Sequence, residues 1–127
     1  MMVPEVKGLL LDALKSGEYQ QAKGYLKIDK DGVTGYCCLG VLCDIADKVT
    51  DLDVSFSKAD GEFRAWSISR TEKEADGYEF KNNYSAYPPD DVRDWAGLTD
   101  GQMVQLANIN DEGDSFDAVI EHIETNL

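Results

Sequence analysis

The side chains best suited to chemistry are three thiols, Cys37, Cys38 and Cys43, and the single imidazole, His122. Zinc takes four ligands, usually from cysteine and histidine pairs at short spacing, but Cys37 and Cys38 are adjacent and point to different faces of a helix or strand. A nucleophilic cysteine needs a base or cation beside it, whereas His122 lies near the end of the last predicted helix, where the dipole favours a cation. The pattern predicts buried structural cysteines, with no metal and no cofactor.

A second chemical pattern resembles the start of a calcium loop. Asn108, Asn110 and Glu112 place oxygen atoms at alternate positions, and Gly113 occupies the sixth. The bidentate glutamate that closes such a loop would fall at position 119, which is Val119. We therefore expect a turn between two helices here and no calcium site.

Acidic residues form clusters before and after residue 100. Both clusters lie at predicted helix starts, where carboxylates are favoured by the helix dipole, and neither has a recognisable catalytic frame. They indicate a protein that is not an enzyme. A surface of this kind can attract a basic protein or imitate nucleic acid, and it can equally serve solubility. The candidate protein-binding residues are Asp90, Asp91, Asp94, Asp111, Glu112 and Asp114.

Charge is distributed unevenly along the 127 residues, whose formal net charge is −13. Residues 71–127 carry 14 acids against Lys73, Lys81 and Arg93. Residues 98–123 have the rhythm of a helix-turn-helix, but DNA reading needs basic phosphate contacts. Phosphate backbones would be repelled, so the sequence argues against a nucleic-acid partner.

Aromatic side chains are concentrated in a short polar segment. Tyrosines interleaved with asparagines are typical of binding surfaces, and such rings could stack on a nucleotide base. The alternative is that they cover the edge of a sheet. The candidate ligand-binding residues are Tyr78, Phe80, Lys81, Tyr84 and Tyr87, with Arg70 or Arg64 available for phosphates.

The elements that must position these residues begin with a helix over residues 4–16, predicted by Pro4 and an apolar stripe. Residues 24–29 and 33–37 are expected as strands around a turn at 30–32. A buried helix follows from Cys38, with Val49 on its inner face. Gly40 lies inside this helix, which is typical of a site where another backbone approaches closely.

The second half is expected to start with a β-hairpin over residues 51–70, turning at Asp60–Gly61. Residues 71–87 are predicted as a long loop with a short edge strand near 78–80. A short helix over 90–96 ends at Gly97, and Thr99 with Gln102 has capping-box spacing for the next helix. A turn at 110–114 and a last helix capped by Asp114 or Ser115 complete the chain.

Together these elements predict a single α+β domain over residues 1–127. A small antiparallel sheet from 24–38 and 52–68 would pack against the N-terminal and central helices. A C-terminal helical hairpin would close the core. No window is apolar enough to span a membrane, and the N-terminus does not resemble a secretory signal.

Several motifs resemble those of a family of small uncharacterised proteins from tailed phages and prophages. They are the stretch Tyr36–Asp44 (YCCLGVLCD), Pro88-Pro89, Trp95–Leu98, and an ending with Asn110-Asp111, Gly113 and Ser115-Phe116. Residues 50–86 would be the variable middle. Ile109 and Val119 stand where the family pattern has leucine and isoleucine. The resemblance implies a phage accessory protein acting in the host cytoplasm, where three reduced cysteines are also expected.

We therefore expect a non-enzymatic accessory protein that binds a host or defence protein through an acidic surface. One alternative is a small-ligand protein that binds or sequesters a nucleotide. Another is a structural, virion-associated protein. A homo-oligomer remains open in each case.

Overall fold

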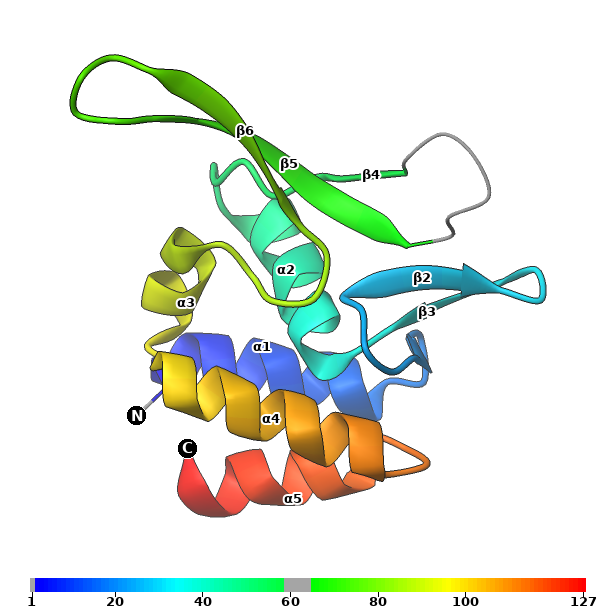
Figure 1. Ribbon diagram of the computed structural model, residues 1–127. Helices are drawn as coiled ribbons and strands as arrows, with labels where there is room; N and C mark the ends of the chain where they lie inside the picture. Colours follow the sequence, from blue (N-terminus) through cyan, green and yellow to red (C-terminus); the bar gives the residue numbers. More distant parts are fainter. Residues whose placement is uncertain (1, 59–64) are drawn as a thin grey trace.

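The computed structural model describes residues 2–58 and 65–127, which fold into a single α+β domain (Figure 1). Helices gather on one side of the molecule and two small sheets on the other. The predicted turn at Asp60–Gly61 and the candidate Arg64 lie outside the described residues. In the described ranges no helix is both long and apolar enough to cross a membrane.

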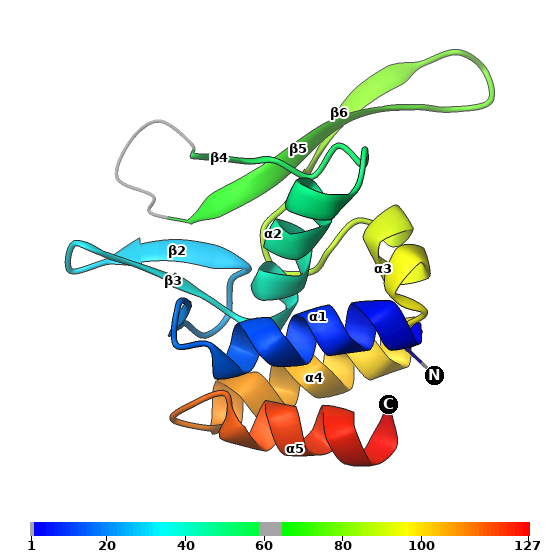
Figure 2. The same ribbon diagram turned by 180° about the vertical axis from the view of Figure 1, so that it is seen from behind.

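The first helix is α1 (Pro4–Lys15), as predicted. Its buried residues are Val6, Leu10 and Leu14, one per turn of the helix. Leu9, expected on the same stripe, is 42% exposed. Helix α1 lies beside α4 (Asp100–Glu112) and α5 (Asp117–Asn126) in a layer that both views show (Figures 1 and 2).

Sheet one has the order β1-β3-β2. Strands β2 (Lys27–Lys30) and β3 (Val33–Tyr36) form the predicted hairpin. Asp31 and Gly32 both have positive φ, at 53° and 79°, which is the geometry of a two-residue turn that suits an Asp-Gly pair. The two-residue strand β1 (Gln20–Gln21), which was not predicted, runs parallel to β3.

Helix α2 (Cys38–Val49) is the most buried element, as expected from its apolar sequence. It rises from the helical layer toward the second sheet (Figure 1). The prediction for Gly40 is confirmed: a Cβ there would lie 1.7 Å from the carbonyl oxygen of Leu26. The prediction for Val49 is wrong, since its side chain is 54% exposed at the end of the helix.

Sheet two has the order β4-β5-β6, and it corrects two predictions. β4 (Phe56–Lys58) and β5 (Trp66–Lys73) form the expected hairpin, but its first strand begins at Phe56 and not at residue 51. However, residues 71–87 are not a long loop, because β5 continues to Lys73 and β6 (Glu79–Tyr84) pairs with it. The sequence of β6 is largely polar and does not show the alternation of apolar and polar residues that indicates a half-buried strand. For this reason only a short edge strand near residues 78–80 was predicted.

The expected single sheet is in fact two sheets, which an isolated bridge from Ile28 to Ala65 joins in the described residues. A cluster of side chains reinforces this junction. The ammonium of Lys27 lies 3.9 Å from the ring centroid of Trp66, and the rings of Tyr36 and Phe56 lie within 5.4 Å of it. A cation held over aromatic faces is attracted to each of them.

The C-terminal half is helical. Helix α3 (Asp90–Ala96) ends at Gly97 in the left-handed conformation, and both capping-box hydrogen bonds between Thr99 and Gln102 are present. The predicted turn at 110–114 is wrong in its start, because α4 continues to Glu112. The predicted cap of the last helix by Asp114 or Ser115 is wrong, because Phe116 occupies the N-cap position and no side chain caps the helix. The hydroxyl of Ser115 still accepts a hydrogen bond from the amide of Asp117, one residue beyond. Helices α4 and α5 form the predicted hairpin.

Candidate functional site

The six predicted protein-binding acids do not form one continuous surface. Asp90, Asp91 and Asp94 belong to α3, which lies beside the start of α4 (Figure 1). Asp111, Glu112 and Asp114 lie at the other end of α4. A helix rises about 1.5 Å per residue, so the two groups are separated by about 16 Å along α4.

Basic side chains neutralise much of the α3 group. Arg93 forms ion pairs with Asp90, Asp94 and Asp100 at 3.4, 3.1 and 2.8 Å. Its hydrogen bonds to Asp100 and Asp94 raise the pKa of the guanidinium above its ordinary value. Arg70 forms a further ion pair with Asp91 at 2.7 Å. This end of α4 is therefore a network of opposite charges.

Asn110 organises the opposite end of α4. Its side chain is fully buried, although it is polar. The amide oxygen accepts a hydrogen bond from the backbone N–H of Cys38 at 3.2 Å, and the amide nitrogen donates to the carbonyl of Ala22 at 2.8 Å. Asp111 accepts a hydrogen bond from the N–H of Gly24 at 3.1 Å. The Asn110-Asp111 motif thus fastens the start of α2 and the β1–β2 connection to α4.

The α4–α5 hairpin carries seven acids and neither lysine nor arginine. One of them, Asp100, belongs to the network of Arg93. We call the other six the C-terminal acidic surface, and all six are exposed. Its members are Asp111, Glu112, Asp114, Asp117, Glu121 and Glu124.

The arrangement of this surface comes largely from α5. Asp117, Glu121 and Glu124 follow at i, i+4 and i+7, so they line one side of the helix. Val119 and Ile123 are buried on the other side. These three α5 acids are not among the predicted binding residues, although their spacing alone predicts a common face.

Most carboxylates of the C-terminal acidic surface have no cationic partner in the described part of the chain. Glu124 pairs with Lys15 at 3.3 Å, and Asp114 approaches Lys23 at 3.9 Å while staying fully exposed. Within residues 2–58 and 65–127, Glu112, Asp117 and Glu121 form no ion pair. Carboxylates left in this state are free to meet cations from another molecule.

A hollow of about 260 Å³ adjoins the surface, between α4 and α5. Ile109 and Ala118 supply its apolar part, and Glu121 supplies a carboxylate at its border. His122 also lines it, with Nδ1 lying 3.2 Å from the amide nitrogen of Asn126. An apolar floor beside a carboxylate suits the aliphatic stem and charged head of a lysine or arginine.

The aromatic segment is divided by the pleat of β6. Phe80 and Tyr84 lie on one face with Asn82, and Lys81 lies on the other. The hydroxyl of Tyr84 donates to Glu72, which raises the pKa of Tyr84, and Asn82 donates to the same carboxylate at 3.1 Å. The rings therefore cover the sheet and do not share a face with the nearest cation.

The other residues of the proposed ligand site are also dispersed. Tyr78 stacks on Phe80 at 6.4 Å between ring centroids and is 63% exposed. Tyr87 lies beyond β6, beside Tyr25 and Cys37. Arg70 is engaged with Asp91 and with the carbonyl of Asp53. The structure does not bring these side chains together around one cavity.

The chain matches a family model, described as a domain of unknown function (DUF8296), over residues 2–127. It belongs to that family. The expectation of membership in a family without an assigned activity is therefore confirmed. No curated relative matches the chain, and no solved structure matches it.

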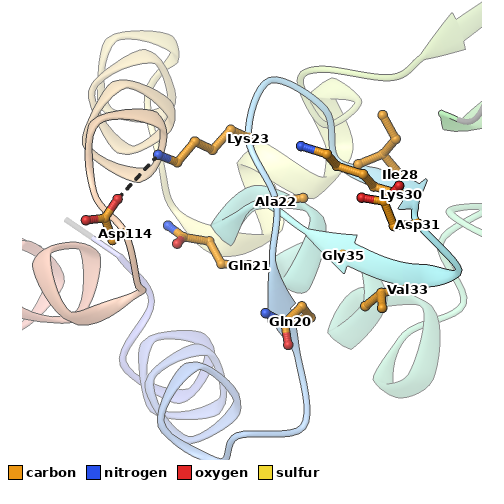
Figure 3. A pocket seen from close by; sticks show the side chains of 10 residues that line it. All are labelled: Gln20, Gln21, Ala22, Lys23, Ile28, Lys30, Asp31, Val33, Gly35 and Asp114. Atoms are coloured by element: carbon orange, nitrogen blue, oxygen red, sulfur yellow. Dashed lines mark ion pairs between the residues drawn. The ribbon is translucent and has the colours of Figure 1, made fainter.

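A groove of this DUF8296 chain lies over sheet one, with a volume of about 790 Å³ (Figure 3). It is open, and two lysines and two aspartates are among the residues that line it. Lys23 reaches across it to Asp114, and Lys30 and Asp31 lie at its far side. The lining therefore combines side chains of both charges with the backbone of Gly35, and no single chemical type predominates in it.

The cysteines of the DUF8296 chain are free and buried, as predicted. Burial raises the pKa of Cys37 to about 11 and those of Cys38 and Cys43 well above their usual value. Thiols held protonated are poor nucleophiles and poor metal ligands. Among the described residues, no three His, Cys, Asp or Glu side chains converge as a metal site would require.

Proposed function

We propose that this protein is a non-enzymatic accessory protein that binds a basic surface of another protein through its C-terminal acidic surface. The observation that carries the proposal is the α4–α5 hairpin, whose acids are exposed, aligned on α5 and largely without cationic partners. Complementary charge steers association and selects the partner. The hollow beside Glu121 adds an apolar contact for a partner's basic side chain.

The biological setting we propose comes from the motifs. The YCCLGVLCD stretch and the Asn110-Asp111 ending resemble small proteins of tailed phages and prophages. An accessory protein of a phage acts in the host cytoplasm, so the partner would be a host or defence protein. The α3 acids contribute less to this surface than the sequence indicated, because Arg93 and Arg70 neutralise them.

Charge reversal tests the proposal. The triple variant Asp114→Lys, Asp117→Lys and Glu121→Lys should lose the partners that wild type captures from host-cell extract. A matched triple variant, Asp51→Lys, Asp53→Lys and Glu74→Lys, makes the same charge change at exposed positions away from the α4–α5 hairpin. It should capture the same partners as wild type.

The captured partner is then purified and titrated at increasing salt. We expect its affinity for wild type to fall steeply between about 0.05 and 0.5 M salt, because exposed charges are screened over this range. Circular dichroism would show that both triple variants are folded. Equal binding by wild type and the Asp114, Asp117 and Glu121 variant would contradict the proposal.

A further inference from the structure

Strand β6 presents an open edge outside the proposed protein-binding surface. It is the last strand of sheet two, and no strand in the described part of the chain pairs with its outer side. Figure 1 shows the β5–β6 hairpin projecting from the body of the molecule, so this edge is approachable. An edge with free N–H and C=O groups is a template for another strand.

The hydrogen bonding of the β5–β6 hairpin shows which backbone peptide groups of β6 point away from β5. The N–H of Glu74 donates to the carbonyl of Tyr78 at 2.8 Å, so the peptide groups of Tyr78 face β5. Along an antiparallel strand this direction alternates from residue to residue. The peptide groups of Glu79, Lys81 and Asn83 therefore face away from β5.

We infer that the outer edge of β6 pairs antiparallel with β6 of a second copy of this chain, centred on Phe80. In this register Glu79 lies opposite Lys81 of the second copy, and Lys81 lies opposite its Glu79. All four residues have outward peptide groups, which gives about four interchain backbone hydrogen bonds. The two Phe80 residues face each other on the twofold axis, as an isologous interface requires.

Charge selects this register among those that the peptide directions permit. Moving the twofold axis by one residue, from Phe80 to Lys81, places the two Lys81 residues of the dimer opposite each other, and like charges directly opposite are destabilising. Moving the axis one residue further leaves both charges opposite asparagine or serine. Only the register centred on Phe80 pairs both charges, and Glu79 and Lys81 are exposed. Glu79 also approaches Lys73 of its own hairpin at 3.9 Å, an exposed pair that leaves the carboxylate accessible to a second cation.

Aromatic contacts support the same register. Phe80 would meet its own copy at a position where facing side chains approach closely. Tyr78 is stacked on Phe80 and 63% exposed, so it would extend this contact on the same face. Two such pairs would form one continuous aromatic strip across the twofold axis.

Sedimentation velocity over about 10–500 μM protein tests the pairing. We expect a concentration-dependent dimer for wild type. Glu79→Lys or Lys81→Glu alone should weaken it by roughly tenfold or more, because each places like charges opposite one another. Lys30→Glu makes the same charge change as Lys81→Glu on sheet one, at an exposed position. It should leave the dimer unchanged.

Mixing the two weakened variants provides a sharper test. An equimolar mixture of Glu79→Lys and Lys81→Glu should form heterodimers, seen by native mass spectrometry, because opposite charges then face each other at both positions. The double variant, with both changes in one chain, should regain the homodimer. A wild-type protein that stays monomeric at about 500 μM overturns the inference. So does a mixture that stays monomeric, or an equal loss with Lys30→Glu.

Discussion

At the scale of single residues, two buried positions fix how the elements meet. Gly40 lets the carbonyl of Leu26 reach the side of α2, where any Cβ would overlap it. That carbonyl also accepts a hydrogen bond from the N–H of Cys37 at 3.2 Å. Asn110 ties Cys38 and Ala22 to α4. Gly40 makes room for a backbone carbonyl, and the side-chain amide of Asn110 hydrogen-bonds to two backbone groups. Few other residues could replace either of them.

Gly40→Ala should therefore lower the free energy of unfolding by about 3 kcal/mol, because backbone atoms must move to admit the methyl group. Urea denaturation measures the change. Gly8→Ala is the control within α1, where an added Cβ meets nothing within 4 Å. It should raise stability by about 0.5–1 kcal/mol, as alanine favours the helix. Equal stabilities for wild type and Gly40→Ala would contradict the overlap.

At the scale of elements, α2 begins with an unusual cap. The thiol of Cys37 accepts a hydrogen bond from the N–H of Gly40 at 3.4 Å, in the position that serine or aspartate more often occupies. The side chain is buried among apolar residues. Burial is what keeps this thiol protonated, because desolvation opposes the thiolate, whereas the hydrogen bond from Gly40 favours it.

This burial predicts a loss of stability at alkaline pH. The pKa of Cys37 is raised to about 11 from an ordinary 9.0. Below about pH 9 the thiol is protonated in both states, so its contribution is constant. Between the two values the unfolded state releases the proton and the folded state retains it, so stability falls as pH rises.

Cys37→Ser removes this titrating group and keeps a side chain that can cap α2. We expect the free energy of unfolding to fall less steeply for Cys37→Ser than for wild type between pH 9 and 11, by at most about 1.4 kcal/mol per pH unit. Urea denaturation at several pH values measures both slopes. Parallel profiles would show that Cys37 is not responsible.

At the scale of the whole molecule, charge is the dominant property. The net charge is −13, and the acids of α5 stand in a line with neither lysine nor arginine on their own helix, although Glu124 pairs with Lys15 of α1. Like charges spaced three or four residues apart destabilise a helix. The C-terminal acidic surface thus costs stability at low salt, which is consistent with a role in binding.

Glu121→Gln should raise the free energy of unfolding by about 0.3 kcal/mol at low ionic strength, since it removes repulsion with Asp117 and Glu124. Thermal or urea denaturation at low salt and at about 1 M NaCl measures the effect. The gain should disappear at high salt, where these charges are screened. A destabilising effect of Glu121→Gln at low salt would show that the three acids of α5 do not repel one another appreciably.

Local signals predicted the elements whose stability is local. Pro4, the Asp31-Gly32 turn and the Thr99 capping box lie where the sequence indicated, because each acts within a few residues. The Cys38 helix and its tight approach at Gly40 were also predictable, since a long apolar stripe requires burial. Which acids are paired with a cation was not predictable, because it depends on how the elements are placed: Lys15 of α1 meets Glu124 of α5, and Arg70 of β5 meets Asp91 of α3.

The sequence alone determined the helices, the first hairpin, the buried cysteines and the acidic excess of the C-terminal half. Only the tertiary structure decided that β6 is a strand, since its polar residues are held by pairing with β5 and not by burial. It also decided that Asn110 is buried, that two sheets replace one, and which carboxylates are paired with a cation from another element. Each of these depends on contacts between distant segments, which periodicity does not report.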